Sequence, residues 1–430
     1  MRATRKIASF RVGAAMTALA LLAAGCTSSG HGTSHASPAA AARPTASAAA
    51  PVPRVVITPG NGADGVNPSA GITVTATRGT LTDVAVHTTG DSVSGQLSQD
   101  GRTWHSSQWT LDVSQSYTVT ATATAPGHGG TVTTTSTFRT MTPRQTFRTF
   151  IFEGYHQTYG VGIPIMLVFS QPITDKAAVE RSLQLRTSKP VVGAWYWDGS
   201  QTLDFRPRDY WPSGTTVSFT GHLNGVRGAP GVYGAHTLTQ TFYIGRSLVA
   251  IGNTATHRTQ IYYNGKLRYN WPISSGRPGD ATPNGSYLTI EKANPVEMKG
   301  PGYDLMVPWS VRFTFSGDYY HDAYWSVGEQ GFDNVSHGCV NLSPAHAETY
   351  YKLAVPGDPI TIKGSPKPGT WDNGWTEWFL SWPQYLRGSA LHQAVRAGPA
   401  GSMFVDPSSL PPSTARAPLQ TAPANNSNAR

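Results

Sequence analysis

The sequence predicts a mainly β protein, made of several sandwich-like modules that are joined by turns. Charged residues make up only 13% of the 430 residues, below the usual share in soluble proteins, which disfavours helix bundles and coiled coils. Glycine (45) and proline (32) are abundant, and stretches rich in threonine and valine alternate between polar and apolar residues, as half-buried strands do. A hydrophobic content of 39% argues against both a disordered chain and a multi-span membrane protein.

The first 25 residues have the pattern of a bacterial signal peptide. Basic residues precede an apolar stretch over 12–24, which is too short to span a bilayer as a permanent helix. The segment ends in the sequence LAAGC, with Cys26 as its last residue, and this resembles the bacterial lipobox. The resemblance implies cleavage before Cys26 and a lipid on its sulfur, so we expect a lipid-anchored protein on the outer face of the cell membrane that acts in the cell wall. An ordinary signal peptide followed by a chance cysteine is the alternative.

The charge of the chain is positive but diffuse. Removal of residues 1–25 lowers the formal net charge from +9 to about +5, a mild excess that suits an anionic cell-surface setting. The sequence holds no run of Lys and Arg interleaved with aromatic residues, so we expect no nucleic-acid partner.

Residues 26–53 contain small and polar residues with almost no large apolar side chain, and are expected to form a disordered tether. From 54 to 142 the pattern changes to period two, most cleanly in 72–77 and 117–124, with turn signals between the alternating stretches. Short strands at this spacing predict an immunoglobulin-like β-sandwich. The module contains no cysteine, so it lacks an inter-sheet disulfide.

A second β module, also expected to be immunoglobulin-like, covers residues 143–246. Its strands are predicted over 161–169 and 202–207, and one short helix over 177–185. Neither module shows clustered histidines, acids or nucleophiles. We interpret both as spacers or wall-binding modules and favour the spacer role.

Residues 247–364 form a third unit, which is rich in strands at first and changes pattern after Cys339. Ser343 is placed as the N-cap of a helix with Pro344 in its first turn, and the helix is expected to end near Leu353. A closing strand is predicted over 358–362.

A piece rich in tryptophan follows at 365–397 and is predicted to be a C-terminal subdomain with a short helical stretch near 375–380. Its tryptophans are expected to pack rather than to serve as a platform for sugars. The remaining residues, 398–430, are expected to be a disordered tail.

Cys339 is the only thiol left in the folded protein if Cys26 carries lipid, and exported proteins rarely keep one unpaired cysteine. Such a residue is either buried and inert or retained for its reactivity. A nucleophilic cysteine reacts as a thiolate, which a base within hydrogen-bond reach can produce. His337 is two residues away, whereas His321 lies 18 residues upstream on a strand expected over 315–321, and we favour His321 as the base.

Gly338 lets the backbone approach a substrate carbonyl closely, so that N–H groups near 338–339 can stabilise an oxyanion. The residues therefore predict a Cys/His acyl-transfer site: thiolate attack, a covalent acyl-enzyme and transfer to a second nucleophile. A buried cysteine beside a satisfied histidine is the alternative.

This stretch resembles the active-site motif of the L,D-transpeptidases with a YkuD-type catalytic domain: a histidine, a spacer, then Ser/Thr-His-Gly-Cys-x-Asn. The segment 274–285 resembles the Thr-Pro-x-Gly turn of the same family, and the likeness covers 247–364. The order of the modules is similar to that of lipoprotein members from mycobacteria and other actinobacteria. The matching residues of the motif are His321, Ser336, His337, Gly338, Cys339 and Asn341.

The resemblance implies a mostly β catalytic domain with one short helix after the nucleophile. It also implies a reaction on peptidoglycan stem peptides. Cys339 would attack the carbonyl of the third residue of a tetrapeptide donor, a diamino acid, and expel the terminal D-Ala. His321 would act as base toward the thiol and later toward the side-chain amine of an acceptor stem, giving a 3→3 cross-link. Carbapenems would acylate Cys339.

Other roles are implied by position. Tyr303 matches a substrate-binding tyrosine of the family's lid loop, near the oxyanion and the donor stem. His337 is implied to be a catalytic residue that orients the site, with a purely structural loop residue as the alternative. Asn341 would contact substrate or hold the motif loop. The residues implied to bind the donor backbone are Ser316 and Gly317, and those implied to support the oxyanion or the backbone are Gly338, Ser336 and Asp322.

Two departures from the family pattern stand out. Asp322 occupies a position where Ser or Gly is common, and its carboxylate could pair with His321 and raise the pKa of that imidazole. The loop 225–231 lacks the acids with which some relatives bind calcium, and the histidines show no zinc spacing. We therefore expect no metal and no cofactor, and we expect a monomer.

Three other functions remain open at this stage. A cysteine L,D-carboxypeptidase and a transferase that attaches a protein to the wall use the same acyl-enzyme and differ only in the acceptor. A non-catalytic wall-binding lipoprotein would not need Cys339 and His321. A sortase-like enzyme is disfavoured, because no arginine follows Cys339 before Arg387.

Overall fold

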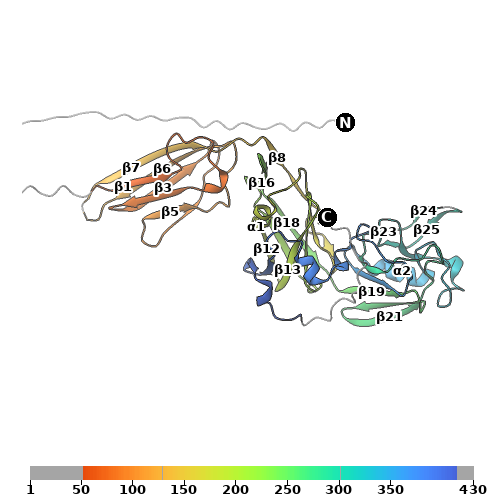
Figure 1. The fold of residues 1–430 in the computed structure, drawn as a ribbon. Helices are drawn as coiled ribbons and strands as arrows, with labels where there is room; N and C mark the ends of the chain where they lie inside the picture. The colour runs from red at the N-terminus through yellow and green to blue at the C-terminus, as the bar shows by residue number, and fades with distance from the viewer. Residues whose placement is uncertain (1–51, 128, 301, 414–430) are drawn as a thin grey trace, which may run out of the picture. The chain divides into compact units, whose positions relative to one another are not determined.

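The computed structural model describes residues 52–127, 129–300 and 302–413, which are drawn in colour in Figure 1. The predicted signal peptide, Cys26, nearly all of the expected tether and residues 414–430 of the expected tail lie outside the described residues. The described part is mainly β, as predicted, with 31 strands and three short α-helices. None of its helices is long and apolar enough to cross a membrane.

The first immunoglobulin-like sandwich shows how alternation in the sequence produces a core. In β6 (Ser116–Thr124), Tyr117, Val119 and the alanines are buried, while the alternate threonines pair across the ladder with those of β7 (Thr131–Arg139). Its four-stranded sheet has the order β1 (Arg54–Thr58), β2 (Thr73–Thr77), β5 (Thr103–Ser106), β4 (Gly95–Leu97), and its three-stranded sheet has the order β3 (Thr80–His87), β6, β7.

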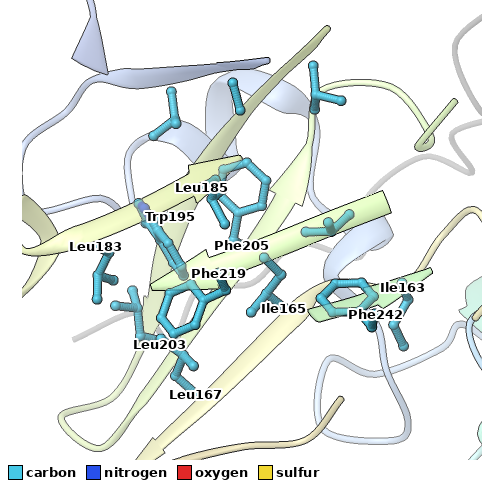
Figure 2. Packing of buried hydrophobic residues seen from close by; sticks show 14 of the residues in the cluster. Ile163, Ile165, Leu167, Leu183, Leu185, Trp195, Leu203, Phe205, Phe219 and Phe242 are labelled. Carbon is cyan, nitrogen blue, oxygen red and sulfur yellow. The ribbon is translucent and has the colours of Figure 1, made fainter. Parts of the chain in front are cut away.

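The second sandwich is built around a larger aromatic core. Figure 2 shows side chains such as Leu185, Phe205 and Phe219, from three different strands, meeting in this core. Its four-stranded sheet has the order β10 (Thr158–Tyr159), β18 (Leu238–Ile244), β15 (Thr216–Gly221), β12 (Leu183–Thr187). A small sheet has the order β16 (Arg227–Ala229), β17 (Val232–Gly234), β8 (Gln145–Phe147). The short helix predicted over 177–185 is α1 (Lys176–Arg181), and it ends earlier than expected because Leu183 begins β12.

The C-terminal segment corrects the expectation of a disordered tail at 398–430. The six-stranded sheet of the second sandwich has the order β31 (Gly401–Val405), β30 (Ala394–Gly398), β13 (Val191–Asp198), β14 (Thr202–Pro207), β11 (Ile165–Phe169), β9 (Thr149–Ile151). The expected tail therefore begins with a strand, which is followed by the 3-10 turn η4 (Pro407–Ser409). Strand β31 pairs with β30, which in turn pairs with β13, so that Ala397 lies opposite Val191. Such distant pairing leaves no distinctive local pattern in the sequence.

The tryptophan-rich piece is also not a separate subdomain. Trp375 and Trp378 are buried in the hydrophobic core of the second sandwich, so these tryptophans pack, as predicted. The helical stretch expected at 375–380 is the 3-10 turn η3 (Glu377–Phe379), and a further helix, α3 (Trp382–Leu386), follows it.

The third unit has its own core between two sheets. The predicted helix is α2 (Pro344–Leu353), which packs on this core through Ala347 and Tyr350, and the predicted closing strand is β29 (Pro359–Lys363). One sheet has the order β21 (Lys266–Pro272), β20 (Arg258–Tyr263), β19 (Leu248–Asn253), β29, β22 (Gly285–Leu288). The other has the order β23 (Glu291–Ala293), β26 (Ser310–Arg312), β27 (Tyr319–Asp322), β28 (Val340–Leu342), and a hairpin is formed by β24 (Val296–Gly300) and β25 (Tyr303–Val307).

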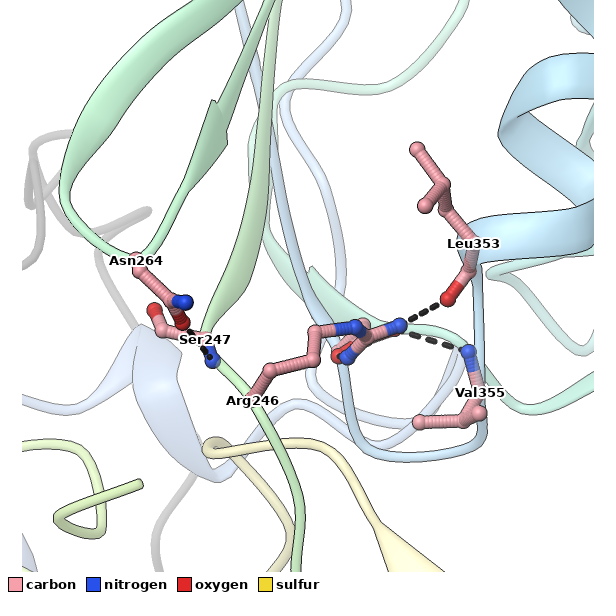
Figure 3. A network of polar contacts seen from close by, with 6 residues as sticks. Arg246, Ser247, Asn264, Leu353 and Val355 are labelled. Carbon is pink, nitrogen blue, oxygen red and sulfur yellow. Dashed lines mark hydrogen bonds and ion pairs between the residues drawn. The ribbon is translucent and has the colours of Figure 1, made fainter. Parts of the chain in front are cut away.

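A largely buried ion pair ties the start of this unit to the loop after α2. The guanidinium of Arg246 contacts both oxygens of Asp358, at 2.6 and 2.9 Å. It also donates to the carbonyl of Leu353 at the end of α2, as Figure 3 shows. The Asp358 side chain is fully buried and accepts a further bond from the Val355 N–H at 2.7 Å. Burial raises the pKa of Asp358 to about 6, although the hydrogen bonds and charge of Arg246 lower it.

Candidate active site

A cavity of about 290 Å³ opens in the third unit and contains six of the residues singled out from the sequence. Its apolar wall comes largely from the β24–β25 hairpin and from Trp325. Glu329 and Ser326 add polar groups that sequence reasoning did not predict. The predicted residues that line the cavity are Tyr303, His321, Ser336, His337, Cys339 and Asn341.

Parallel strand pairing brings the predicted nucleophile and the predicted base to one place. Strands β27 and β28 are parallel neighbours, with His321 opposite Asn341 and Tyr320 opposite Val340. Because Tyr320 and Val340 point into the core, His321 and Asn341 point to the opposite face of the sheet, where the cavity lies. Cys339 directly precedes β28. The strand expected over 315–321 is shorter than predicted, since β27 begins only at Tyr319.

The imidazole of His321 is held in its neutral form. Its Nδ1 lies 2.7 Å from the main-chain carbonyl oxygen of Asp322, and a carbonyl can only accept, so Nδ1 carries the proton and Nε2 is left with its lone pair. Burial lowers the pKa of His321 to about 4, and the hydrogen bond to Asp322 raises it only partly.

The sequence left open whether the Asp322 carboxylate pairs with His321, and the structure shows that it does not. The carbonyl of Asp322 holds the imidazole, and the pKa of His321 is lowered rather than raised. The carboxylate oxygen Oδ1 of Asp322 is buried without a hydrogen-bond partner among the described residues.

Cys339 is partly exposed, and its thiol rests against the turn before β27. The Sγ donates to the carbonyl oxygen of Gly317 at 3.7 Å. Burial, and after it the negative charge of Asp318, raise the pKa of Cys339 to about 12, although the Tyr319 N–H lowers it. The resting site therefore holds a neutral thiol and a neutral imidazole.

The motif loop is braced from both sides. Ser336 donates its hydroxyl to the Cys339 carbonyl at 2.6 Å and accepts from the Gly338 N–H at 3.2 Å. Thr282 donates to the Gly338 carbonyl at 2.6 Å and accepts from the Gly276 N–H at 2.9 Å. Thr282 belongs to the Thr-Pro-x-Gly turn, so the segment noted in the sequence supports the loop that carries Cys339.

Asn341 and the hairpin residue Tyr303 complete the cavity. The Asn341 side chain donates to Ser326 Oγ at 2.8 Å, while its Oδ1 is buried and has no partner among the described residues. Tyr303 lies at the start of β25, so the expected lid loop is in fact a β-hairpin. Its ring packs against that of His337, with the ring centroids 4.7 Å apart.

Ser316 and Gly317 lie in the turn before β27 and do not line the cavity. Asn373, from the tryptophan-rich piece, accepts from the Ser316 N–H at 2.8 Å and donates to its hydroxyl at 2.9 Å. Gly317 has a φ of +100°, a conformation that suits glycine. Asn373 was not singled out from the sequence, because a lone asparagine in a loop carries no signal of its own.

Comparisons with known proteins identify two parts of the chain. Residues 247–362 match the family described as L,D-transpeptidase catalytic domain, and residues 63–227 match the family described as bacterial Ig domain. L,D-transpeptidase 2 of Mycobacterium tuberculosis (strain CDC 1551 / Oshkosh) is 31% identical over 353 residues, which cover 79% of this chain and 85% of the relative. The chain belongs to the L,D-transpeptidase family.

Another relative is L,D-transpeptidase 5 of Mycobacterium tuberculosis (strain ATCC 25618 / H37Rv), which is 35% identical over 355 residues. The alignment covers 79% of this chain and 78% of that relative. A solved structure of the L,D-transpeptidase LdtMt1 in complex with imipenem is 34% identical to this chain. The alignment covers 50% of this chain and 97% of that one, with a TM-score of 0.43.

Within the described residues of this L,D-transpeptidase, no group of three or more His, Cys, Asp or Glu side chains could hold a metal ion. The groups that line the cavity include the thiol of Cys339 and the imidazole of His321, whose Nε2 keeps its lone pair.

Proposed function

We propose that this L,D-transpeptidase cross-links peptidoglycan stems through a cysteine acyl-enzyme, with a tetrapeptide donor and a 3→3 product. The observation that carries the proposal is the pairing of β27 with β28, which sets His321 beside Asn341, two residues after Cys339, at one cavity. A neutral imidazole whose Nδ1–H is fixed on a carbonyl is the form that can take a thiol proton on Nε2.

In the first half-reaction the Sγ of Cys339 attacks the carbonyl carbon of the donor's third residue as its proton moves to His321 Nε2. The pKa values of about 12 and about 4 mean that no thiolate–imidazolium pair is populated at rest, so the proton moves together with the attack. The backbone N–H of Cys339 stabilises the oxyanion, since that of Gly338 already donates to Ser336 Oγ. The C–N bond to D-Ala then breaks, and the leaving amine takes the proton from His321.

In the second half-reaction the side-chain amine of an acceptor stem attacks the thioester carbonyl. Its proton passes to His321 Nε2, the C–S bond breaks and the sulfur regains a proton. The new amide is the 3→3 cross-link. The apolar wall of the cavity disfavours water, which favours the amine over hydrolysis.

The sequence supports a location for this reaction on the outer face of the cell membrane. The basic n-region, the short apolar stretch and the LAAGC segment support export, a lipid on Cys26 and an anchor on the outer face of the membrane. We also propose that the protein acts as a monomer and that carbapenems acylate Cys339, since a strained β-lactam carbonyl reacts with a thiol in the same way as the donor carbonyl.

Mass spectrometry of the protein incubated with a diamino-acid tetrapeptide muropeptide tests the proposal. We expect an adduct on Cys339 with loss of D-Ala, followed by a cross-linked dimer. An adduct that resolves only to free tripeptide would instead support a carboxypeptidase. If the Cys339→Ala variant still produced the cross-linked muropeptide dimer, the cysteine mechanism would be overturned.

A further inference from the structure

Asp318 presses its carboxylate against the glycine that precedes Cys339. A Cβ built on Gly338 would lie 2.3 Å from Asp318 Oδ1, a distance that real Cβ atoms essentially never show. The space where any other residue would place its side chain is therefore filled by a carboxylate oxygen. Asp318 lies three residues before His321 and was not singled out from the sequence.

The two oxygens of this carboxylate have different surroundings. Thr314 Oγ1 and Ser316 Oγ both donate to Oδ2, at 2.7 and 3.2 Å, and the Asp318 N–H donates back to Thr314 Oγ1 at 2.8 Å. Among the described residues, none donates a hydrogen bond to Oδ1. The residue is only 9% exposed and adjoins the cavity wall at Gly338 without being one of the lining residues. One oxygen is anchored in the turn, while the other faces Gly338 and takes no hydrogen bond from the described residues.

No cation neutralises this carboxylate at close range. In the described part of the chain, no Lys, Arg or His nitrogen lies within ion-pair distance of Asp318. Burial raises the pKa of Asp318, while the hydrogen bonds from Thr314 and Ser316 and, least of all, the charge of Lys367 lower it. The other groups that the Asp318 charge reaches are Tyr287, Tyr303 and Cys339, all of which are neutral at rest.

The position of the Asp318 carboxylate makes the thiolate form of Cys339 less favourable when no substrate is bound. A negative charge beside a thiol disfavours the thiolate, and active cysteines usually have cationic neighbours instead. The part of this cost that comes from Asp318 falls if the substrate itself supplies a cation, although burial remains the larger cause of the raised pKa of Cys339. A donor whose third residue is a diamino acid carries a side-chain ammonium, a few methylene groups away from the carbonyl that Cys339 attacks.

We propose that Asp318 Oδ1 binds the side-chain ammonium of the donor's third residue and thereby couples donor recognition to activation of Cys339. The inference rests on the proposed function, since it takes the donor from it. Without a cationic donor the carboxylate adds to burial in keeping the thiol protonated, which protects a lone cysteine in an oxidising compartment. With the ammonium in place the charge is neutralised, and sulfur can attack as its proton leaves.

Two thiol reagents of similar size test the charge without any peptide. Methyl methanethiosulfonate is neutral, whereas aminoethyl methanethiosulfonate carries an ammonium; in both, the new S–S bond forms as methanesulfinate leaves. At Cys339 we measure the rate constant of the cationic reagent divided by that of the neutral reagent. We expect this ratio to be about tenfold higher than the same ratio for free cysteine, which corresponds to one modest charge contact. A ratio equal to that of free cysteine in the wild-type protein overturns the proposal, whatever any variant does.

Asp318→Asn keeps the shape and the bond from Thr314 but removes the charge. In this variant we expect the ratio to fall to the free-cysteine value, and the neutral reagent to react faster because the thiol is easier to ionise. Asp280→Asn is the matched control, because the Asp280 side chain is 41% exposed and is paired with Arg277 at 2.8 Å. Its main-chain oxygen lies 3.8 Å from the same Cβ position on Gly338, so the control is also close to the motif loop. The ratio in Asp280→Asn should equal that of the wild type.

A pair of donor peptides tests recognition. One has the diamino acid at position three, and the other has norleucine, which lacks the ammonium. The wild type should prefer the first in kcat/KM by about tenfold or more, and Asp318→Asn should lose the preference while retaining turnover of the norleucine donor. An undiminished preference in Asp318→Asn would overturn the ammonium site. If the wild type turned over neither donor, the proposed function would fail, while the reagent ratio would still decide on the charge.

Discussion

The Nδ1 of His321 lies 2.7 Å from the main-chain carbonyl oxygen of Asp322, and the adjacent carboxylate of Asp322 takes no part in that bond. The backbone therefore orients the imidazole, and any residue at position 322 supplies the same carbonyl. The side chain of Asp322, which departs from the family pattern, is not used to tune the imidazole.

Replacement of Asp322 by Asn is expected to leave kcat/KM within a few-fold of the wild-type value, because the orienting carbonyl is unchanged. His321→Ala should lower kcat by at least about 100-fold, as loss of a general base does. Steady-state release of D-Ala measures both. A loss in Asp322→Asn as large as that in His321→Ala would show that the carboxylate, not the carbonyl, supports the base.

Gly338→Ala should damage the site in two ways, by straining the backbone and by a collision with Asp318. The residue has a φ of +131°, and its new Cβ would also collide with Asp318. We expect a loss of stability of about 1–3 kcal/mol from the backbone, together with a loss of activity that Asp318→Gly partly restores. Gly265→Ala is the control, because Gly265 has a φ of +76° and nothing within 4 Å of its Cβ position. Equal effects at both glycines would argue against the collision.

Arg246→Ala is expected to destabilise the catalytic domain by about 3–5 kcal/mol, since it leaves Asp358 fully buried and without its cation. Adding Asp358→Asn should recover part of the loss, because an amide tolerates burial better than an unpaired carboxylate. Urea unfolding curves measure both variants. Arg277→Ala, which breaks an exposed pair with Asp280, should change stability by less than about 1 kcal/mol.

Stability should fall as the pH rises from about 4.5 to about 8. Burial raises the pKa of Glu153 to about 8 and that of Glu377 to about 7, so in this window the folded chain keeps protons that the unfolded chain has released. The state that binds more protons becomes less stable relative to the other as the pH rises. Well below about 4.5 both glutamates are protonated in both states, and their contribution to the dependence vanishes.

Glu153→Gln should flatten this dependence and raise the unfolding free energy at pH 8 relative to the wild type. Thermal unfolding at about pH 5, 6, 7 and 8 gives the comparison. Glu348→Gln, on α2 and paired with Lys352 at 2.7 Å, is the control and should leave the slope unchanged. A wild-type protein that became more stable between about pH 5 and 8 would contradict the assignment.

The sequence predicted much of this architecture for local reasons. Alternation over 117–124 predicted β6, and Ser343 with Pro344 predicted the start of α2. The short strands β30 and β31 escaped prediction because β30 pairs with β13, from a distant part of the chain, and β31 pairs with β30. Trp375 and Trp378 were expected to pack, but the core that receives them belongs to the second sandwich.

The sequence by itself determined the family and its candidate catalytic residues, because a thiol, two histidines and a glycine follow one another in a distinctive order, with a second signature upstream. Only the tertiary structure decided how that chemistry is controlled. The parallel pairing of β27 and β28 brings His321 to the cavity, a carbonyl rather than a carboxylate holds its Nδ1, and Asp318 meets Gly338. These are contacts across folded strands and turns, and their charges depend on burial, which no local pattern of residues specifies.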